Sequence, residues 1–318
     1  MPILLRRMLA LAMLACFLSS SMYCRTQPII PYADGEIGEV CMNTTFKYMT
    51  FNSSCSYAGL ANMLLRYGVD TQDREIARDM KLPFLFACEE DEYRAGPMLQ
   101  GAQWFNLYLH PKGLEMRETE VPAQGVAAYL RRQRTAMLGI RGIENGKHAV
   151  VYIGNREEKL LFLNNKWERA DAPTQLLLTE QTLLSYLDDR VIIATLAPVD
   201  PCAVDIISRM RRSITVLQQN AREICMLCQE TMPVAVLRSR MDSLFRALLL
   251  DGITMLNLLG EGDLAARLLP LQRGLLDAVR NETEANVSLG DYLSPDALTA
   301  AAQAYAARIQ REIDSMKN

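Results

Sequence analysis

A thiol at the predicted start of a helix is the residue of this sequence best placed to do chemistry. Cys55 follows Ser53 and Ser54 and opens an apolar pattern of three- and four-residue steps that runs to Gly68. This pattern predicts a helix beginning at Cys55, with one of the two serines as its cap. The positive end of a helix dipole favours a thiolate, and the unpaired N–H groups there can hold an oxyanion. We therefore expect Cys55 to be a nucleophile.

The base that such a thiol needs must be one of only two histidines. His110 precedes a proline and reads as a loop residue, whereas His148 opens an apolar strand. Asn164 and Asn165 end the following strand, and antiparallel pairing would bring that strand beside His148. A third group of this kind orients the imidazole through its other nitrogen. Either asparagine is a candidate for that role.

In the part of the chain that contains these residues, the sequence predicts helices first and strands afterwards. Helical patterns cover residues 55–68, 71–80 and 97–109, and a further helix ends near residue 134. Strand patterns follow at residues 136–140, 148–154, 159–163 and 190–195, with a tight turn predicted at Asn145-Gly146. The expected fold class is α+β, with N-terminal helices packed on an antiparallel sheet.

A second domain is expected after the proline-containing segment 198–201. Amphipathic helical stretches cover residues 203–228, 234–259, 263–279 and 295–316, and Pro270 should kink or break the third. We therefore divide the chain into a domain at 46–198 and an all-α C-terminal domain at 199–318. The C-terminal helices are candidates for packing or for binding a protein partner.

The N-terminus has the composition of an export signal. Arg6 and Arg7 precede a short apolar run and then three serines, which predicts a signal peptide at residues 1–21. Cys16 follows a loose lipoprotein-type box, so a lipid on Cys16 is an alternative to plain cleavage. Residues 22–45 form an irregular lead-in. The predicted location is outside the cytoplasm, as a periplasmic, cell-envelope lipoprotein or secreted protein, with membrane contact only through the signal segment or that lipid.

The cysteine count fits an exported protein with one reactive thiol. Eight cysteines less Cys16 leave seven, so at least one stays unpaired in an oxidising compartment unless it bonds another chain. An unpaired Cys55 with six paired cysteines is the simplest arrangement. Cys225 and Cys228 lie one helical turn apart, and we predict a structural disulfide within this pair or to Cys202.

Composition excludes several classes of function. The formal net charge is −3 and basic residues do not cluster, so a nucleic-acid partner has no electrostatic support. The C-terminal helices show no metal-ligand cluster and no glycine-rich phosphate loop. We expect no metal and no cofactor.

Residues 55–68 and 146–154 resemble the nucleophile helix and the histidine strand of the double-glycine, bacteriocin-processing cysteine peptidases. In that family an acidic or amide residue follows the histidine by 16 positions, and Asn164 stands there. The resemblance covers about 150 residues, roughly 46–198. It implies a papain-like fold that acts on a peptide or protein substrate, with Asn164 rather than Asn165 as the orienting residue.

The same resemblance implies that Cys55 is the nucleophile and His148 the general base. The sequence departs from the family pattern at two positions: Ser56 replaces the usual glycine, and Met49 replaces the glutamine that supplies the oxyanion hole. Asn52 lies nearby and is the candidate replacement donor.

Three functions follow from such a site. The first is a cysteine peptidase or amidase that cleaves peptide bonds. The second is a catalytically inactive, peptide-binding relative of the same fold. The third is an acyltransferase, since an acyl group on Cys55 can pass to an amine as well as to water.

Overall fold

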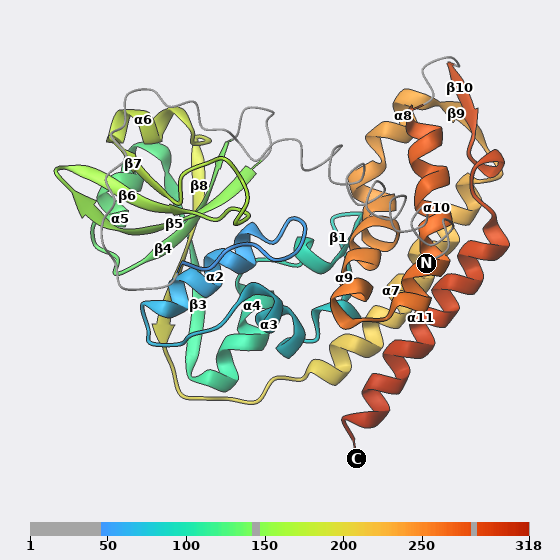
Figure 1. Ribbon diagram of the computed structural model, residues 1–318, viewed down its shortest axis with the longest axis horizontal. Coiled ribbons are helices and arrows are strands. Elements are labelled where there is room, and N and C mark those ends of the chain that lie inside the picture. Colours follow the sequence, from blue (N-terminus) through green and yellow to red (C-terminus); the bar gives the residue numbers. More distant parts are fainter. Residues whose placement is uncertain (1–45, 142–146, 281–284, 318) are drawn as a thin grey trace, which may run out of the picture. The chain divides into compact units, whose positions relative to one another are not determined.

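The computed structural model describes residues 46–141, 147–280 and 285–317 (Figure 1). The predicted signal peptide, the lead-in with its cysteines, Cys16 and the Asn145-Gly146 turn lie outside the described residues. The chain forms two compact units. The first contains the described residues up to Asp73 together with residues 115–198, and the second contains residues 74–114 and 199–317.

The first unit is built on a six-stranded sheet with the strand order β3-β8-β4-β5-β6-β7. Each pairing from β8 to β7 is antiparallel. Its elements are α2 (Cys55–Leu65), β3 (Leu114–Pro122), α5 (Val126–Leu130), β4 (Ala136–Arg141), β5 (Lys147–Arg156), β6 (Lys159–Asn164), β7 (Gln175–Leu178), α6 (Glu180–Ser185) and β8 (Arg190–Pro198), with a 3₁₀ turn at Ala123–Gly125.

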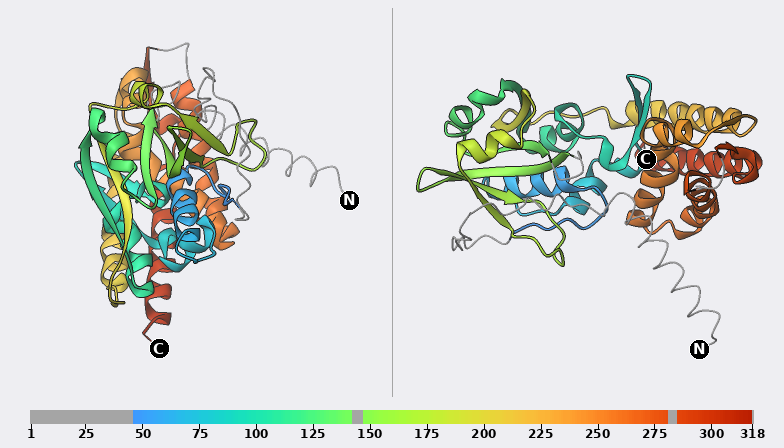
Figure 2. Two further views of the ribbon diagram at one scale, coloured as in Figure 1. Left: turned by 90° about the vertical axis from the view of Figure 1, so that its left-hand side faces the viewer. Right: turned by 90° about the horizontal axis from the view of Figure 1, so that it is seen from above.

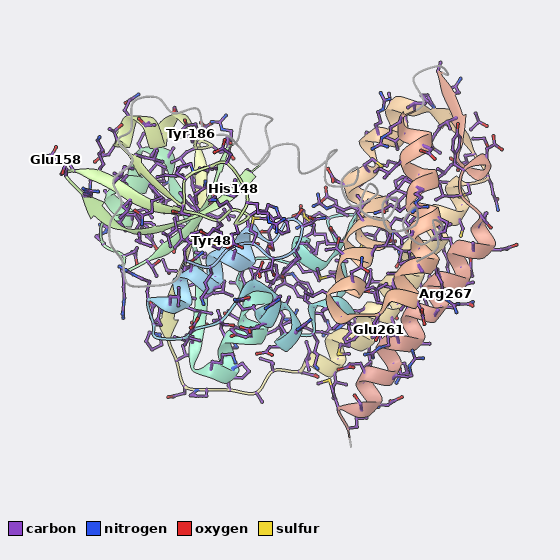
Figure 3. All side chains as sticks on the ribbon, viewed as in Figure 1. Tyr48, His148, Glu158, Tyr186, Glu261 and Arg267 are labelled. Atoms are coloured by element: carbon purple, nitrogen blue, oxygen red, sulfur yellow. The ribbon has the colours of Figure 1, made fainter. Side chains whose placement is uncertain are left out.

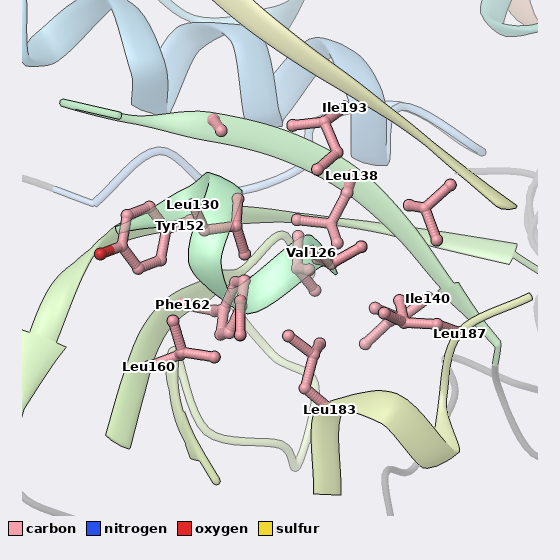
Figure 4. Close-up of a cluster of buried hydrophobic side chains, with 14 of the residues drawn as sticks. Val126, Leu130, Leu138, Ile140, Tyr152, Leu160, Phe162, Leu183, Leu187 and Ile193 are labelled. Atoms are coloured by element: carbon pink, nitrogen blue, oxygen red, sulfur yellow. The ribbon is translucent and has the colours of Figure 1, made fainter. Parts of the chain in front are cut away.

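One face of this sheet carries the hydrophobic core of the first unit (Figure 4). Alternate residues of β5, among them Val150 and Tyr152, point into a cluster that also contains Val126 of α5 and Leu183 of α6. Because side chains alternate along a strand, the residues between them face the opposite side. Val151 accordingly lies against Gly59 of α2.

Helix α2 packs on that opposite face, against β4 and β5 (Figure 2). A Cβ atom on Gly59 would lie 2.6 Å from Sδ of Met137 and 2.7 Å from Nδ2 of Asn165. Only a residue without a side chain therefore allows the helix to approach the sheet this closely. The alternation of β5 and the glycine in α2 together fix the position of the helix that begins at Cys55.

The second unit is mainly helical. Its elements are α3 (Asp73–Asp79), β1 (Phe86–Glu89), β2 (Glu92–Ala95), α4 (Ala102–Leu109), α7 (Ile206–Leu227), β9 (Thr231–Pro233), α8 (Val234–Ser239), π-helical segments at Met241–Phe245 and Ala247–Asp251, α9 (Gly252–Leu259), α10 (Gly262–Arg280), β10 (Asn286–Ser288) and α11 (Pro295–Ser315). Short 3₁₀ turns occur at Leu82–Phe84, Gly96–Met98, His110–Lys112 and Leu289–Asp291. The long helices α7 and α11 pack side by side.

Residues 74–114 are bound to this helical region by specific contacts. The Tyr305 hydroxyl on α11 donates a hydrogen bond to the Pro83 carbonyl at 2.6 Å. The Phe86 N–H donates to Oγ of Ser213 on α7 at 2.9 Å, and the rings of Phe86 and Tyr305 lie 5.4 Å apart, edge to face. These buried contacts explain why the segment groups with the C-terminal helices.

The fold class expected from the sequence is confirmed: helices pack on an antiparallel sheet, and a helical region follows. The division of the chain differs from a single boundary at 198, because residues 74–114 cluster with the C-terminal helices. No helix among the described residues is long and apolar enough to span a membrane.

The structure resolves two of the predicted C-terminal helical stretches in more detail. Helix α10 runs without a break through Pro270, since Leu268, Leu271 and Leu275 around it are buried in the core and hold both halves in place. Residues 234–259 do not form one α-helix but two α-helices joined by π-helical turns. Buried side chains bond the carbonyls of these turns: Asn220 donates to the Leu244 carbonyl and Gln272 to the Leu249 carbonyl.

The predicted disulfide at Cys225 and Cys228 is absent. All five cysteines of the described segments are outside disulfides. Sγ of Cys225 instead lies 3.5 Å from the Pro295 carbonyl oxygen, and Cys228 is buried. Burial raises the pKa of the Cys228 thiol to about 11, which keeps it protonated and inert.

Candidate active site

Cys55 is the first residue of α2 and is half-buried. Ser54, one of the two serines considered as the cap, occupies the N-cap position, but its hydroxyl makes no capping bond to the helix. It donates instead to Oδ2 of Asp73 at 2.7 Å. The Ser54 side chain therefore does not cap the first turn of α2.

A buried network of amide hydrogen bonds fastens α2 to the sheet. Nδ2 of Asn62 on α2 donates to Oδ1 of Asn165 at 3.2 Å and to the Lys47 carbonyl at 2.9 Å. Nδ2 of Asn165 donates to the Ala149 carbonyl on β5 at 2.9 Å. Both asparagines are almost completely buried, so these bonds are costly to break. Asn165 thus joins the helix to the strand that carries His148.

His148 lies at the beginning of β5 (Figure 3). It meets Asn164 at the end of β6. The imidazole Nε2 lies 2.8 Å from Oδ1 of Asn164. The register makes this possible, because Asn164 pairs with Val150, two residues beyond His148 on the same face of the sheet.

The orientation of the Asn164 amide determines which nitrogen of His148 can act as a base. Nδ2 of Asn164 donates to the Pro173 carbonyl at 3.0 Å, so its Oδ1 is the atom that faces the imidazole. An amide oxygen only accepts hydrogen bonds, which assigns the imidazole proton to Nε2. Nδ1 therefore keeps its lone pair and is the nitrogen able to take a proton.

Burial determines the charge of this imidazole. His148 is 6% exposed, and desolvation lowers its pKa to about 4, while the hydrogen bond to Asn164 opposes part of that shift. The ring is therefore neutral near pH 7, which is the protonation state that a general base requires.

The structure separates the two asparagines that the sequence left as alternatives. Asn164 bonds His148, whereas Asn165 bonds Asn62 and Ala149 on the other face of the sheet. The reason is the alternation of side chains, which sends two consecutive residues of a strand to opposite faces. Asn165 is thus a tether for α2 and not a partner of the imidazole.

Met49 and Ser56, at which the sequence departs from the peptidase pattern that it resembles, are both buried. Met49 is buried, and its N–H donates to the Lys166 carbonyl at 2.9 Å, while its thioether has no hydrogen to donate. Ser56 is buried, and its Oγ has no hydrogen-bond partner among the described residues. Asn52 is half-buried in the turn that precedes α2.

Asp73 is a residue of this region that the sequence did not single out. It is fully buried and accepts hydrogen bonds from Thr50 and Ser54, in the segment that leads to Cys55. A polar residue at the predicted start of a helix is ordinarily an exposed cap, so nothing in the sequence indicated a buried carboxylate. The described residues contain no group of three or more acidic, histidine or cysteine side chains suited to a metal ion.

Comparison with known proteins gives only a distant likeness to solved structures. No protein-family model matches the chain, and no curated protein matches it. Among solved structures, the peptidase domain of Streptococcus ComA, described as a bifunctional ABC transporter involved in a quorum-sensing pathway, aligns with 13% identity and a TM-score of 0.36. The alignment covers 48% of this chain and 99% of that domain.

Proposed function

We propose that this protein is a cysteine peptidase or amidase in which Cys55 is the nucleophile, His148 the general base and Asn164 the orienting residue. The observation that carries the proposal is the bond between His148 and an asparagine whose amide is itself anchored to Pro173. An imidazole held by an oriented amide is the arrangement that a thiol nucleophile requires of its base. The helix that begins at Cys55 packs on the strand that carries His148.

The proposed reaction uses each of these features in turn. Sγ of Cys55 attacks the carbonyl carbon of a peptide bond while its proton passes to Nδ1 of His148. The first-turn N–H groups of α2 stabilise the oxyanion. The C–N bond then breaks, and the imidazolium returns the proton to the departing amine. Water hydrolyses the thioester that remains, and His148 again acts as base.

A peptide-binding protein without turnover is the second candidate function, and Met49 is the observation that favours it. A buried thioether at the position of the family's oxyanion glutamine removes one donor. Loss of one such donor costs on the order of 3 kcal/mol of transition-state stabilisation in hydrolases. Asn52 is the side chain proposed to compensate for it.

We further propose that the protein acts outside the cytoplasm, with residues 1–21 as its signal. Support comes from the sequence alone: the arginines at 6 and 7, the short apolar run and the serines that follow. Intact-mass measurement of the protein recovered from its native host would show cleavage after the signal or a lipid on Cys16. An intact N-terminus would contradict export by a cleaved signal.

The helical second unit is proposed to bind a protein partner.

Selective alkylation tests whether Cys55 is a nucleophile. The protein is treated with iodoacetamide at pH 6 and the labelled positions are mapped by mass spectrometry. Cys202 is an exposed thiol in the same chain and serves as the main internal control. Cys88 is a second exposed control, expected to be slower because burial and neighbouring acidic residues raise the pKa of its thiol. We expect Cys55, although half-buried, to react at least about tenfold faster than either control, because only a thiolate attacks the reagent. A slower reaction of Cys55 than of the exposed controls would contradict the proposal.

Hydrolysis of fluorescein-labelled casein distinguishes the two candidate functions. Cleavage that is lost in Cys55→Ala supports the peptidase. Binding of casein that survives in Cys55→Ala, without cleavage by the wild-type protein, supports the peptide-binding protein. Adding an amine such as methylamine and searching for amide products tests the acyltransferase alternative.

A further inference from the structure

A buried carboxylate holds the segment that leads into Cys55. Asp73 is 0% exposed and lies at the first residue of α3. Its Oδ2 accepts hydrogen bonds from the Thr50 N–H and the Ser54 hydroxyl, each at 2.7 Å, and its Oδ1 accepts from the Thr50 hydroxyl at 2.6 Å. One side chain thus binds both ends of residues 50–54, which we name the nucleophile loop.

The nucleophile loop needs such an anchor because its backbone is strained. Ser53 has a φ angle of +58°, in the left-handed region that residues other than glycine rarely adopt. A conformation of this kind persists only where the surroundings hold it. Asp73 bonds the residue directly after Ser53 and the residue three positions before it, so its bonds bracket the strained position.

The bond from Ser54 to Asp73 also determines whether the Ser54 hydroxyl caps the first turn of α2. Ser54 stands at the N-cap, where a serine hydroxyl ordinarily accepts a bond from an N–H of the first turn. The bond to Asp73 engages this hydroxyl as a donor, and no capping bond forms. The Ser54 hydroxyl oxygen therefore does not compete with an anion for the N–H groups of the first turn.

We propose that Asp73 is a positioning residue for Cys55: its hydrogen bonds hold the nucleophile loop and keep the Ser54 hydroxyl away from the first turn of α2. This inference rests on the proposed role of Cys55 and goes beyond it, by assigning the placement of the thiol to a carboxylate outside the Cys55, His148 and Asn164 set. Asp73 bonds Thr50 and Ser54, so its effect on Cys55 passes through the nucleophile loop.

An asparagine at this position separates geometry from charge. Its Oδ1 accepts from the Thr50 N–H and the Ser54 hydroxyl, and its Nδ2 donates to the Thr50 hydroxyl, which can also accept. Asp73→Asn therefore keeps every one of the three contacts, whereas Asp73→Ala removes them all. Asp70, three residues earlier, has a 77% exposed side chain that pairs with Lys47 and not with the nucleophile loop, so Asp70→Ala is the control for loss of a nearby carboxylate.

The test measures the rate of Cys55 alkylation by iodoacetamide in the full-length protein. We expect Asp73→Ala to lower the rate about tenfold or more, because small displacements of a reacting group have large effects on rate. Asp73→Asn and Asp70→Ala should remain within about threefold of wild type. Where casein is cleaved, kcat should fall in Asp73→Ala while KM changes less than twofold. Thermal unfolding measured for each variant identifies any that is not folded at the assay temperature.

Either of two results would overturn the inference. A folded Asp73→Ala that alkylates like wild type shows that the loop needs no anchor, and an Asp73→Asn as slow as Asp73→Ala shows that the hydrogen bonds are not what matters. If Asp73→Ala does not fold, Ser54→Ala removes a single contact and should slow alkylation about threefold; an unchanged rate would again contradict the inference. Alkylation requires no peptide substrate, so a protein that cleaves nothing would refute the proposed peptidase without deciding this test.

Discussion

At the scale of single residues, His148 combines burial with one well-oriented partner. Desolvation lowers the pKa of its imidazole to about 4, and Asn164 fixes the proton on Nε2. Desolvation therefore keeps the ring neutral, and Asn164 leaves the lone pair on Nδ1. The folded state therefore resists protonation of this residue in a range where an unfolded chain accepts the proton.

The stability of the protein should depend on pH through His148. Its folded pKa of about 4 lies below the ordinary value of 6.5, so the unfolded state binds the proton first as the pH falls. The contribution of the neutral His148 ring to the free energy of unfolding is complete above pH 6.5 and is lost progressively toward pH 4. Between pH 7 and pH 5 we expect the free energy of unfolding to fall by about 2 kcal/mol from this group. Urea unfolding at several pH values measures it.

The control for this prediction is His148→Gln, which does not titrate. Its stability should vary less over the same range than that of the wild-type protein, by about the stated amount. Equal pH dependence of the two proteins would mean that His148 is not responsible.

Charge at position 164 should alter the basicity of the imidazole. Asn164→Asp places a carboxylate against Nε2 of His148, and a neighbouring negative charge favours the protonated ring. We expect the pKa of His148 to rise from about 4 by one unit or more, measured by NMR titration of the ring protons. Asn164→Ala removes the hydrogen bond without adding charge and should not raise the pKa. A fall in the Asn164→Asp variant would contradict the assigned geometry.

At the scale of elements, the position of α2 depends on a glycine and an amide network. Gly59 allows close approach to Met137 and Asn165, and Asn62 with Asn165 ties the helix to β5. The helix carries Cys55 and the strand carries His148, so the packing of these two elements sets the geometry of the proposed site.

Gly59→Ala should destabilise the protein even though alanine favours helices. The propensity gain of about 1 kcal/mol is opposed by a Cβ only 2.6 Å from Met137 Sδ and 2.7 Å from Asn165 Nδ2. Overpacking of this kind costs about 1–3 kcal/mol. We expect a net loss of stability and slower alkylation of Cys55. Gly262→Ala in α10 is the control, because nothing lies within 4 Å of its Cβ position. Equal effects of the two changes would refute the close-approach argument.

At the scale of the whole molecule, the chain enters the second unit after Asp73 and returns to the first at residue 115 before leaving it after Pro198. Pro83 and Phe86 then find their partners on α7 and α11, more than a hundred residues further along the chain. The C-terminal helices are thus part of the structure that orders residues 74–114.

A protein truncated after Pro198 should therefore not behave as an independent domain. Residues 74–114 would lose the hydrogen bonds from Tyr305 and to Ser213 and expose the side chain of Phe86. We expect limited trypsin digestion to cut after Arg78 and Arg94 faster in the fragment than in the full-length protein. Equal resistance of both proteins across residues 74–114 would show that the boundary at 198 is sufficient.

The sequence by itself determined the local features of this protein. The helix from Cys55, the strand from His148 and the strand that ends at Asn164 follow from apolar periodicity, because the burial of one face imposes it. Tertiary structure decided what periodicity does not encode. It chose Asn164 over Asn165 through strand register, buried Asp73 beneath the nucleophile loop, kept α10 intact through Pro270 and joined residues 74–114 to helices distant in the chain. Each of these depends on contacts between residues far apart in sequence, whose energies no local pattern records.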